Sequence, residues 1–290
     1  MQVELASAGY TALISQTGAE LVSLRDPSGE EFMWSGDARY WSGRAPILFP
    51  VIGRMKDGGY NFDGRRYDMP KHGLVRRKVW ELESQSPAAV EFSIRADNES
   101  LLHYPFDFEL FCRFELCGPR LSVCYRVLNH GNGEMLFSLG SHPAFALPLE
   151  NGEALEQWSV EFAVAETLDR QVLDGGLIGA NPVANFLQSS RRVQLSETLF
   201  NDDALIFFGL QSQRLDLVHQ SKGKRLSLYT GGAPDLGIWS MPGAPYVCLE
   251  PWYGHDDPVN ASGDLGAKPG LLRLAAGAVF ETGIEIELAR

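Results

Sequence analysis

The sequence contains little cysteine: Cys112, Cys117, Cys124 and Cys248 are the only four among 290 residues. None of them forms a C-x-x-C pair or has a histidine at zinc-finger spacing, which excludes a disulfide framework and a zinc finger as the basis of the fold. Free cysteine is among the residues most often buried in proteins. We therefore expect buried free thiols.

Positive charge and long apolar runs are also scarce. The chain has 25 Lys and Arg against 37 Asp and Glu, a formal net charge of -12. Nucleic acid and anionic membrane surfaces both need a positive field, so we expect neither as a partner. No apolar run approaches the roughly 20 residues that span a bilayer. The N-terminus also lacks a secretory signal. The sequence therefore predicts a cytoplasmic protein, either a monomer or a homodimer.

The common cofactor and metal motifs are missing as well. There is no P-loop, no glycine-rich dinucleotide fingerprint, no H-E-x-x-H and no G-x-S-x-G. Asp256, Asp257 and Asp264 fall in a long polar segment but lack the spacing of a calcium-binding loop. The sequence therefore predicts neither a cofactor nor a metal.

What the sequence does contain is alternation of apolar and polar residues. It runs along 106–116 and again along 121–127, with Gly118-Pro119 between, which predicts an antiparallel hairpin. A second hairpin is predicted over 60–67, where Asp-Gly supplies the positive φ angles of a type I′ turn. No segment has helical periodicity beyond about three turns. These features predict an all-β sandwich or barrel of mainly antiparallel strands, in a single domain over 1–290.

His142 carries the strongest local signal for chemistry. It follows an apolar, strand-like stretch and precedes Pro143, which keeps it extended. Imidazole is the side chain best able to exchange a proton near neutral pH. A satisfied core histidine is the alternative interpretation.

Glu250 ends the apolar stretch 246–249 and is followed by Pro251-Trp252. A carboxylate among apolar residues is costly to bury, and burial raises its pKa toward that of a general base. Trp252 offers a flat face for the C–H side of a sugar ring. The alternative is a glutamate paired with a structural arginine.

Three weaker motifs supply further polar residues. Arg54 follows an apolar run and Gly53, His72 is held between Lys71 and Gly73, and Asp203 precedes a strand. From the residues alone, each is also compatible with an ordinary loop or turn cap.

Taken together, these motifs resemble the aldose 1-epimerase family, in particular its bacterial LacX-like branch. The matching stretches, in order, are Gly53-Arg54, Pro70-Lys71-His72-Gly73, Ser141-His142-Pro143-Ala144-Phe145, Asp202-Asp203-Ala204-Leu205 and Leu249-Glu250-Pro251-Trp252.

The resemblance implies a galactose-mutarotase-like β-supersandwich and a sugar substrate. It also implies that Glu250 is the general base and His142 the general acid, and that His72, Arg54 and Asp203 bind the sugar; Asp202 is the alternative to Asp203. The better-studied galactose mutarotases have Asn-His and Glu-Thr where this chain has Ser-His and Glu-Pro. These departures leave the identity of the sugar open.

The expected reaction is interconversion of the α and β anomers of a free aldohexose by acid/base ring opening. A hexose-6-phosphate mutarotase is one alternative, because five cations are close in sequence and arginine suits phosphate: Arg44, Arg54, Lys56, Arg76 and Arg77. Arg76 is the one that we expect to contact the substrate. The other alternative is a sugar-binding protein without turnover.

Overall fold

The computed structural model describes residues 1–149 and 153–289, and strands form the framework of this part of the chain. Its helices are short 3-10 turns: η1 (Lys56–Gly58), η2 (Val75–Arg77), η3 (Ser100–Leu102), η4 (Leu155–Gln157) and η5 (Leu265–Ala267). None of the described helices has the length and apolar character needed to cross a membrane.

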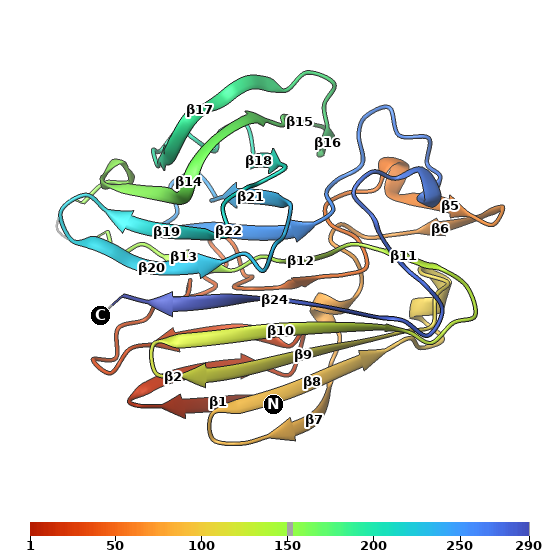
Figure 1. Ribbon diagram of the computed structural model, residues 1–290, viewed down its shortest axis with the longest axis horizontal. Coiled ribbons are helices and arrows are strands. Elements are labelled where there is room, and N and C mark those ends of the chain that lie inside the picture. The colour runs from red at the N-terminus through yellow and green to blue at the C-terminus, as the bar shows by residue number, and fades with distance from the viewer. Residues whose placement is uncertain (150–152, 290) are drawn as a thin grey trace.

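The largest sheet runs through the whole molecule (Figure 1). Its nine strands lie in the spatial order β17 (Val183–Gln194), β14 (Trp158–Arg170), β19 (Arg214–His219), β20 (Gly223–Tyr229), β24 (Val279–Leu288), β10 (Arg120–Asn129), β9 (Phe108–Cys117), β8 (Ala89–Arg95) and β7 (Glu81–Gln85). Every pairing in it is antiparallel. The C-terminal strand β24 joins its two halves, since it lies between β10 and β20.

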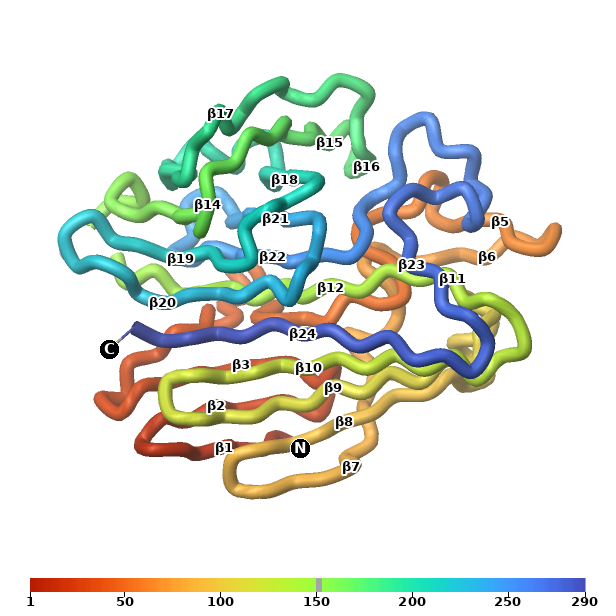
Figure 2. The backbone as a smooth tube through the Cα atoms, in the orientation of Figure 1, coloured from red at the N-terminus to blue at the C-terminus, as the bar shows by residue number. Residues whose placement is uncertain are grey.

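Two further sheets pack against it. The six-stranded sheet contains β18 (Leu205–Phe208), β21 (Asp235–Trp239), β22 (Tyr246–Tyr253), β12 (Leu139–Ser141), β4 (Ile47–Leu48) and β13 (Ala144–Ala146), which pairs with β22. The three-stranded sheet contains β1 (Gln2–Ser7), β2 (Tyr10–Ser15) and β3 (Glu20–Arg25) and lies beside β8 and β9 (Figure 2). The main core lies between these sheets and the large sheet.

Three two-stranded ribbons complete the described strands: β5 (Gly59–Phe62) with β6 (Arg65–Asp68), β11 (Met135–Phe137) with β23 (Leu272–Leu274), and β15 (Leu173–Asp174) with β16 (Leu177–Ile178). The predicted hairpin over 60–67 is the β5–β6 ribbon, and its turn residues Asp63 and Gly64 have φ of 48° and 72°. The predicted hairpin around Gly118 is the β9–β10 pair. Both hairpin predictions and the all-β prediction are confirmed.

The cysteines are only partly as expected. All four are free thiols, but Cys117 and Cys124 are exposed while Cys112 and Cys248 are buried. The expectation of burial is wrong for Cys117 and Cys124 because both follow a core-facing residue in their strands, and alternation turns them to the opposite face.

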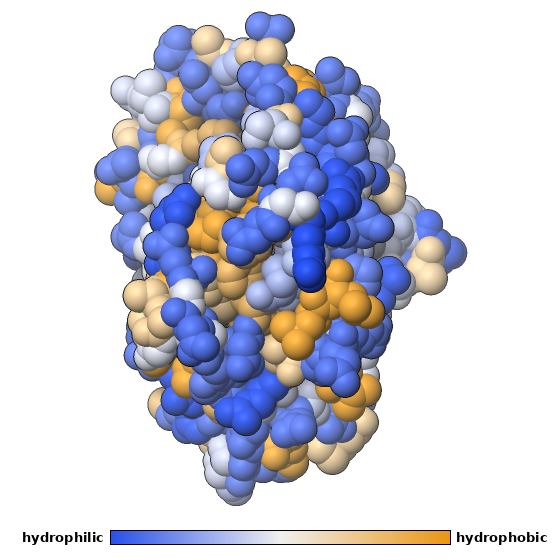
Figure 3. All heavy atoms as spheres, turned by 90° about the vertical axis from the view of Figure 1, so that its right-hand side faces the viewer, coloured by the Kyte–Doolittle hydropathy of each residue, from blue (hydrophilic) through white to orange (hydrophobic). Residues whose placement is uncertain are grey.

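The surface is predominantly hydrophilic on the side shown in Figure 3, with apolar side chains visible in separate areas between polar ones. This mixture is normal for a globular protein.

Candidate active site

Strand β22 is buried on both of its faces. Val247 and Leu249 belong to the main core, whereas Cys248 and Trp252 belong to small clusters on the opposite face. Glu250 alternates with Leu249 and therefore lies on the second face, in line with Cys248 and Trp252. The strand thus carries a carboxyl group into an apolar surrounding.

His142 reaches Glu250 because of an interruption in the neighbouring strand. β12 pairs with the end of β22 and β13 with its beginning, so the short connection between them passes beside Glu250. Two backbone hydrogen bonds hold this connection: the N–H of His142 donates to Pro46 O at 3.2 Å, and the N–H of Leu249 donates to Pro143 O at 3.1 Å. The His-Pro sequence favours this extended break in the ladder.

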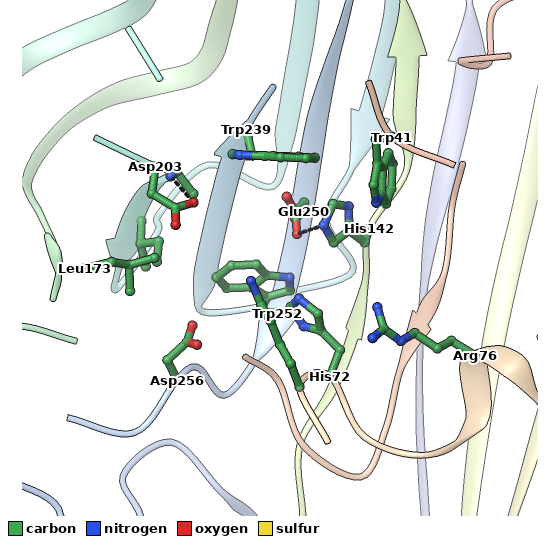
Figure 4. A pocket seen from close by; sticks show the side chains of 13 residues that line it. Trp41, His72, Arg76, His142, Leu173, Asp203, Trp239, Glu250, Trp252 and Asp256 are labelled. Atoms are coloured by element: carbon green, nitrogen blue, oxygen red, sulfur yellow. Dashed lines mark hydrogen bonds and ion pairs between the residues drawn. The ribbon is translucent and has the colours of Figure 1, made fainter. Parts of the chain in front are cut away.

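The two side chains are in contact, with Nε2 of His142 3.1 Å from Oε2 of Glu250 (Figure 4). Both residues are buried, at 8% and 2% exposure. Nevertheless Glu250 Oε2 and His142 Nδ1 have no well-oriented hydrogen-bond partner among the described residues. A buried polar atom without a partner is uncommon and costly, so the site retains hydrogen-bonding capacity for a ligand.

Burial favours the uncharged form of each partner. It raises the pKa of Glu250 well above its usual value; nearby Lys71 opposes this rise, and nearby Asp256 and Asp203 add to it. Burial lowers the pKa of His142 from 6.5 to about 3. Burial therefore favours a protonated Glu250 carboxyl next to a neutral His142 imidazole.

A cavity of about 330 Å³ opens over this pair, and three tryptophans line it: Trp41, Trp239 and Trp252. The ring of Trp41 stacks on His142 at a centroid distance of 4.8 Å, and Trp239 meets His142 edge-on at 6.0 Å. The Trp252 indole lies over glycines of both flanking strands: a Cβ on Gly140 or Gly237 would come within 2.7 or 2.6 Å of it. The volume is of the order found for small-molecule sites, about 300–1,000 Å³.

His72 enters the cavity from a strained backbone, with φ of 66°. The N–H of Gly53 donates to its Nδ1 at 3.1 Å, so Nε2 carries the ring proton and is available as a donor. Burial, together with the neighbouring His142 and Lys71, keeps the pKa of His72 well below its usual value. The ring is therefore a neutral donor set at right angles to His142, with centroids 5.8 Å apart.

Asp203 lines the cavity on the opposite side, where it also has a positive φ of 73°, and Asp202 is not among the lining residues. Arg76, from η2, lines the cavity as well and is partly buried. The structure thus brings six of the seven expected site residues together: Glu250, His142, His72, Asp203, Trp252 and Arg76.

Arg54 is the seventh, and its side chain is exposed and does not line the cavity. Its backbone N–H donates to Asp256 Oδ1 at 2.6 Å, while its side chain lies beside the β15–β16 turn, where a Cβ on Gly176 would come within 2.7 Å of Nε. The bond to Asp256 fixes the backbone of this residue, and the side chain lies against the β15–β16 turn, outside the set of lining residues.

Four polar or aromatic lining residues were not predicted from the sequence as site residues: Trp41, Trp239, Lys71 and Asp256. Lys71 and Asp256 lie within or next to motifs already singled out, so their neighbourhood was a usable signal. Trp41 and Trp239 come from segments without any such motif, and only the packing of the sheets brings them here.

Cys248, His142 and Glu250 have the residue types of a metal site, since their ligand atoms lie within 4.8 Å of one another. Burial raises the pKa of the Cys248 thiol well above its usual value, which keeps it protonated, whereas metals bind the thiolate. The absence of a metal remains a prediction.

The architecture and this cavity define a class of protein: an all-β supersandwich with a cavity that contains a buried histidine–glutamate pair and three tryptophans. The chain belongs to the aldose 1-epimerase family, whose model matches residues 1–265. It is 31% identical over 280 residues to the chromosomal protein LacX of Lactococcus lactis, with 93% of each chain covered.

Solved structures agree with this assignment. A galactose mutarotase related enzyme from Lactobacillus acidophilus superimposes with a TM-score of 0.93 at 31% identity, covering 100% of this chain and 98% of that one. A galactose mutarotase-like protein from Lactobacillus casei gives 0.93 at 27% identity, with both chains fully covered. The expected galactose-mutarotase-like fold is thus confirmed.

Proposed function

We propose that this protein is an aldose 1-epimerase that interconverts the α and β anomers of a free aldohexose, with Glu250 and His142 as its proton-transfer groups. The observation that carries the proposal is their 3.1 Å contact inside a cavity with tryptophan walls. Mutarotation acts on two oxygens, O1 and the ring oxygen, which are bonded to the same carbon. Groups that serve both oxygens must therefore lie close together.

In the proposed reaction, the carboxylate of Glu250 removes the proton from O1 while the imidazolium of His142 gives a proton to the ring oxygen. The bond from C1 to the ring oxygen breaks and C1 becomes an aldehyde carbon. After rotation about the C1–C2 bond, both proton transfers run in reverse and close the ring on the other face. No proton is gained or lost overall. A positioned acid or base typically contributes about 10²–10⁴-fold.

The surroundings of Glu250 and His142 influence the energy of each proton transfer in this reaction. Because burial favours the neutral pair, a proton first passes from the Glu250 carboxyl to the His142 imidazole and gives the carboxylate and the imidazolium; after ring opening both partners are neutral again. Burial favours the neutral pair, so the surroundings of Glu250 and His142 favour proton transfer to the sugar ring. Hydrogen bonds from O1 and to the ring oxygen would support the charged pair at the start.

The experiment is polarimetry on freshly dissolved α-D-glucose and α-D-galactose. We expect Glu250→Gln and His142→Asn each to lower kcat by about 10²-fold or more. Glu109 and His130 form a matched control, since they are a His–Glu pair at 2.8 Å that does not line the cavity. Glu109→Gln and His130→Asn should leave the rate unchanged. Full activity in both cavity variants would refute the assignment.

A phosphorylated aldohexose is a second candidate substrate, because two cations line the cavity without a carboxylate partner. Lys71 and Arg76 make no ion pair within the described part of the chain. A phosphate dianion would supply one. A higher kcat/KM for glucose 6-phosphate than for glucose, lost in Arg76→Gln, would support this candidate. Saturable binding of either sugar without anomerisation would instead indicate a binding protein.

A further inference from the structure

We propose that Asp256 is an additional specificity-determining residue, which accepts a hydrogen bond from a sugar hydroxyl remote from C1, and that the buried Lys268–Asp257 ion pair positions it. This inference rests on the proposed function, because it takes a sugar in this cavity as its starting point.

Asp256 is only 4% exposed, yet it lines the cavity. Its carboxylate points into the space in front of Trp252, on the opposite side from Trp239 (Figure 4). Oδ1 accepts the backbone N–H of Arg54 at 2.6 Å, and no other described residue donates a hydrogen bond to this carboxylate. Oδ2 is therefore available to a ligand.

The position of the carboxylate depends on a glycine. A Cβ on Gly53 would lie 1.9 Å from the carboxylate carbon of Asp256, so any side chain at Gly53 would displace Asp256. Gly53 also has a φ of 67°, a conformation that glycine adopts without strain. The Gly53-Arg54 motif thus serves Asp256 through its backbone, a contact in which the arginine side chain takes no part.

A buried ion pair holds the segment that carries Asp256. Lys268 Nζ lies 2.8 Å from Asp257 Oδ1, with side-chain exposures of 1% and 2%, and it also donates to His255 O at 2.7 Å. The other carboxylate oxygen of Asp257 accepts the backbone N–H of Lys56 at 2.9 Å, and the N–H of Asp257 donates to Arg54 O at 2.9 Å. Asp256 and Asp257 are thereby both joined to residues 54–56.

A second buried contact anchors the start of this segment to the six-stranded sheet. Nδ1 of His255 lies 2.8 Å from Oδ2 of Asp235 in β21, and the His255 ring stacks on Phe208 of β18 at 4.1 Å. Asp256 is therefore held between two buried polar contacts. A rigid acceptor of this kind can select among hydroxyl positions, because a misplaced hydroxyl leaves the acceptor unpaired.

The arrangement of the cavity assigns the kind of group that Asp256 meets. Glu250 and His142 lie on one side of the cavity, and Asp203 and Asp256 lie apart from them on the other (Figure 4). With C1 and the ring oxygen at the acid/base pair, the far side receives the remaining ring hydroxyls. Hydroxyls donate well to carboxylates, whereas a phosphate would be repelled there.

The test compares the wild type with Asp256→Asn, which keeps Oδ1 for the Arg54 N–H but removes the charged acceptor. KM for the preferred free aldohexose should rise about 10- to 100-fold, the loss expected for a hydrogen bond to a charged group. The value of kcat should change much less than KM, because Asp256 touches neither reacting oxygen and acts on Glu250 only through its charge. Asp264→Asn is the matched control, since Asp264 belongs to the same loop but does not line the cavity.

The same measurements with the 2-, 3- and 4-deoxy analogues of that sugar identify the hydroxyl. The analogue that lacks the hydroxyl bound by Asp256 should bind the wild type weakly and lose little further affinity with Asp256→Asn. For the other two analogues, the fold loss of affinity from the missing hydroxyl and that from the substitution should multiply. Unchanged KM in Asp256→Asn, or multiplying losses for all three analogues, would overturn the inference. If the wild type anomerises no sugar, the proposed function has failed, and calorimetric Kd values for the same pairs still test Asp256.

Discussion

The neutral state of His142 leads to a quantitative prediction about stability. In the folded protein the pKa of His142 is lowered from 6.5 to about 3, chiefly by burial. A group whose pKa is lowered by folding stabilises the fold fully above its unfolded pKa, and this contribution is lost as the pH falls toward the folded value. The affected window is therefore from about pH 6.5 down to about pH 3.

The size of this effect follows from the proton that the His142 imidazole binds in the unfolded chain but not in the folded protein. At about pH 4.5 the unfolded imidazole is two pH units below its pKa of 6.5 and protonated, while the folded one, with a pKa of about 3, is not. At about 1.4 kcal/mol per pH unit, the free energy of unfolding should fall by about 3 kcal/mol between about pH 7.5 and pH 4.5 from this group.

Urea unfolding followed by tryptophan fluorescence measures this effect in the wild type and in His142→Gln. Losses common to both, such as those from other titrating groups, cancel when the two are compared at each pH. Between about pH 7.5 and pH 4.5, the free energy of unfolding of the variant should rise relative to that of the wild type by about 3 kcal/mol. A difference that stays constant over this range, at equal m-values, would refute the claim that the buried imidazole is neutral.

Other predictions concern the neighbouring structure. Gly237→Ala should raise KM at least about 10-fold by displacing Trp252, because its Cβ would lie 2.6 Å from the indole; an unchanged KM would show that the indole does not contact the sugar. Lys268→Met should lower the free energy of unfolding by about 3–5 kcal/mol in urea titrations, since it leaves Asp257 buried and unpaired; adding Asp257→Leu should recover part of the loss, and no recovery would argue against the pair. A thiol reagent such as DTNB should modify two cysteines in the native protein and four in urea, because two are buried; four fast reactions in the native protein would contradict their burial.

Local patterns in the sequence were sufficient to predict some of the strands. Alternation along 106–116 and the Asp63-Gly64 turn depend only on neighbouring residues, and both appear in the structure as expected. His142 and Glu250 could also be picked out locally, because a polar group directly beside an apolar strand is conspicuous. Their contact could not be deduced this way, since it depends on where β12 and β13 each pair with β22.

The sequence by itself therefore determined the all-β class, the hairpins and the residue types available for acid/base chemistry, because backbone propensity and alternation act over a few positions. Only the tertiary structure decided that Trp41 and Trp239 form the walls, that Asp256 rather than the Arg54 side chain lines the cavity, and that Cys117 and Cys124 reach the surface. The physical reason is that burial and contact arise from packing between sheets, which joins residues far apart in the chain and leaves no periodic signal along it.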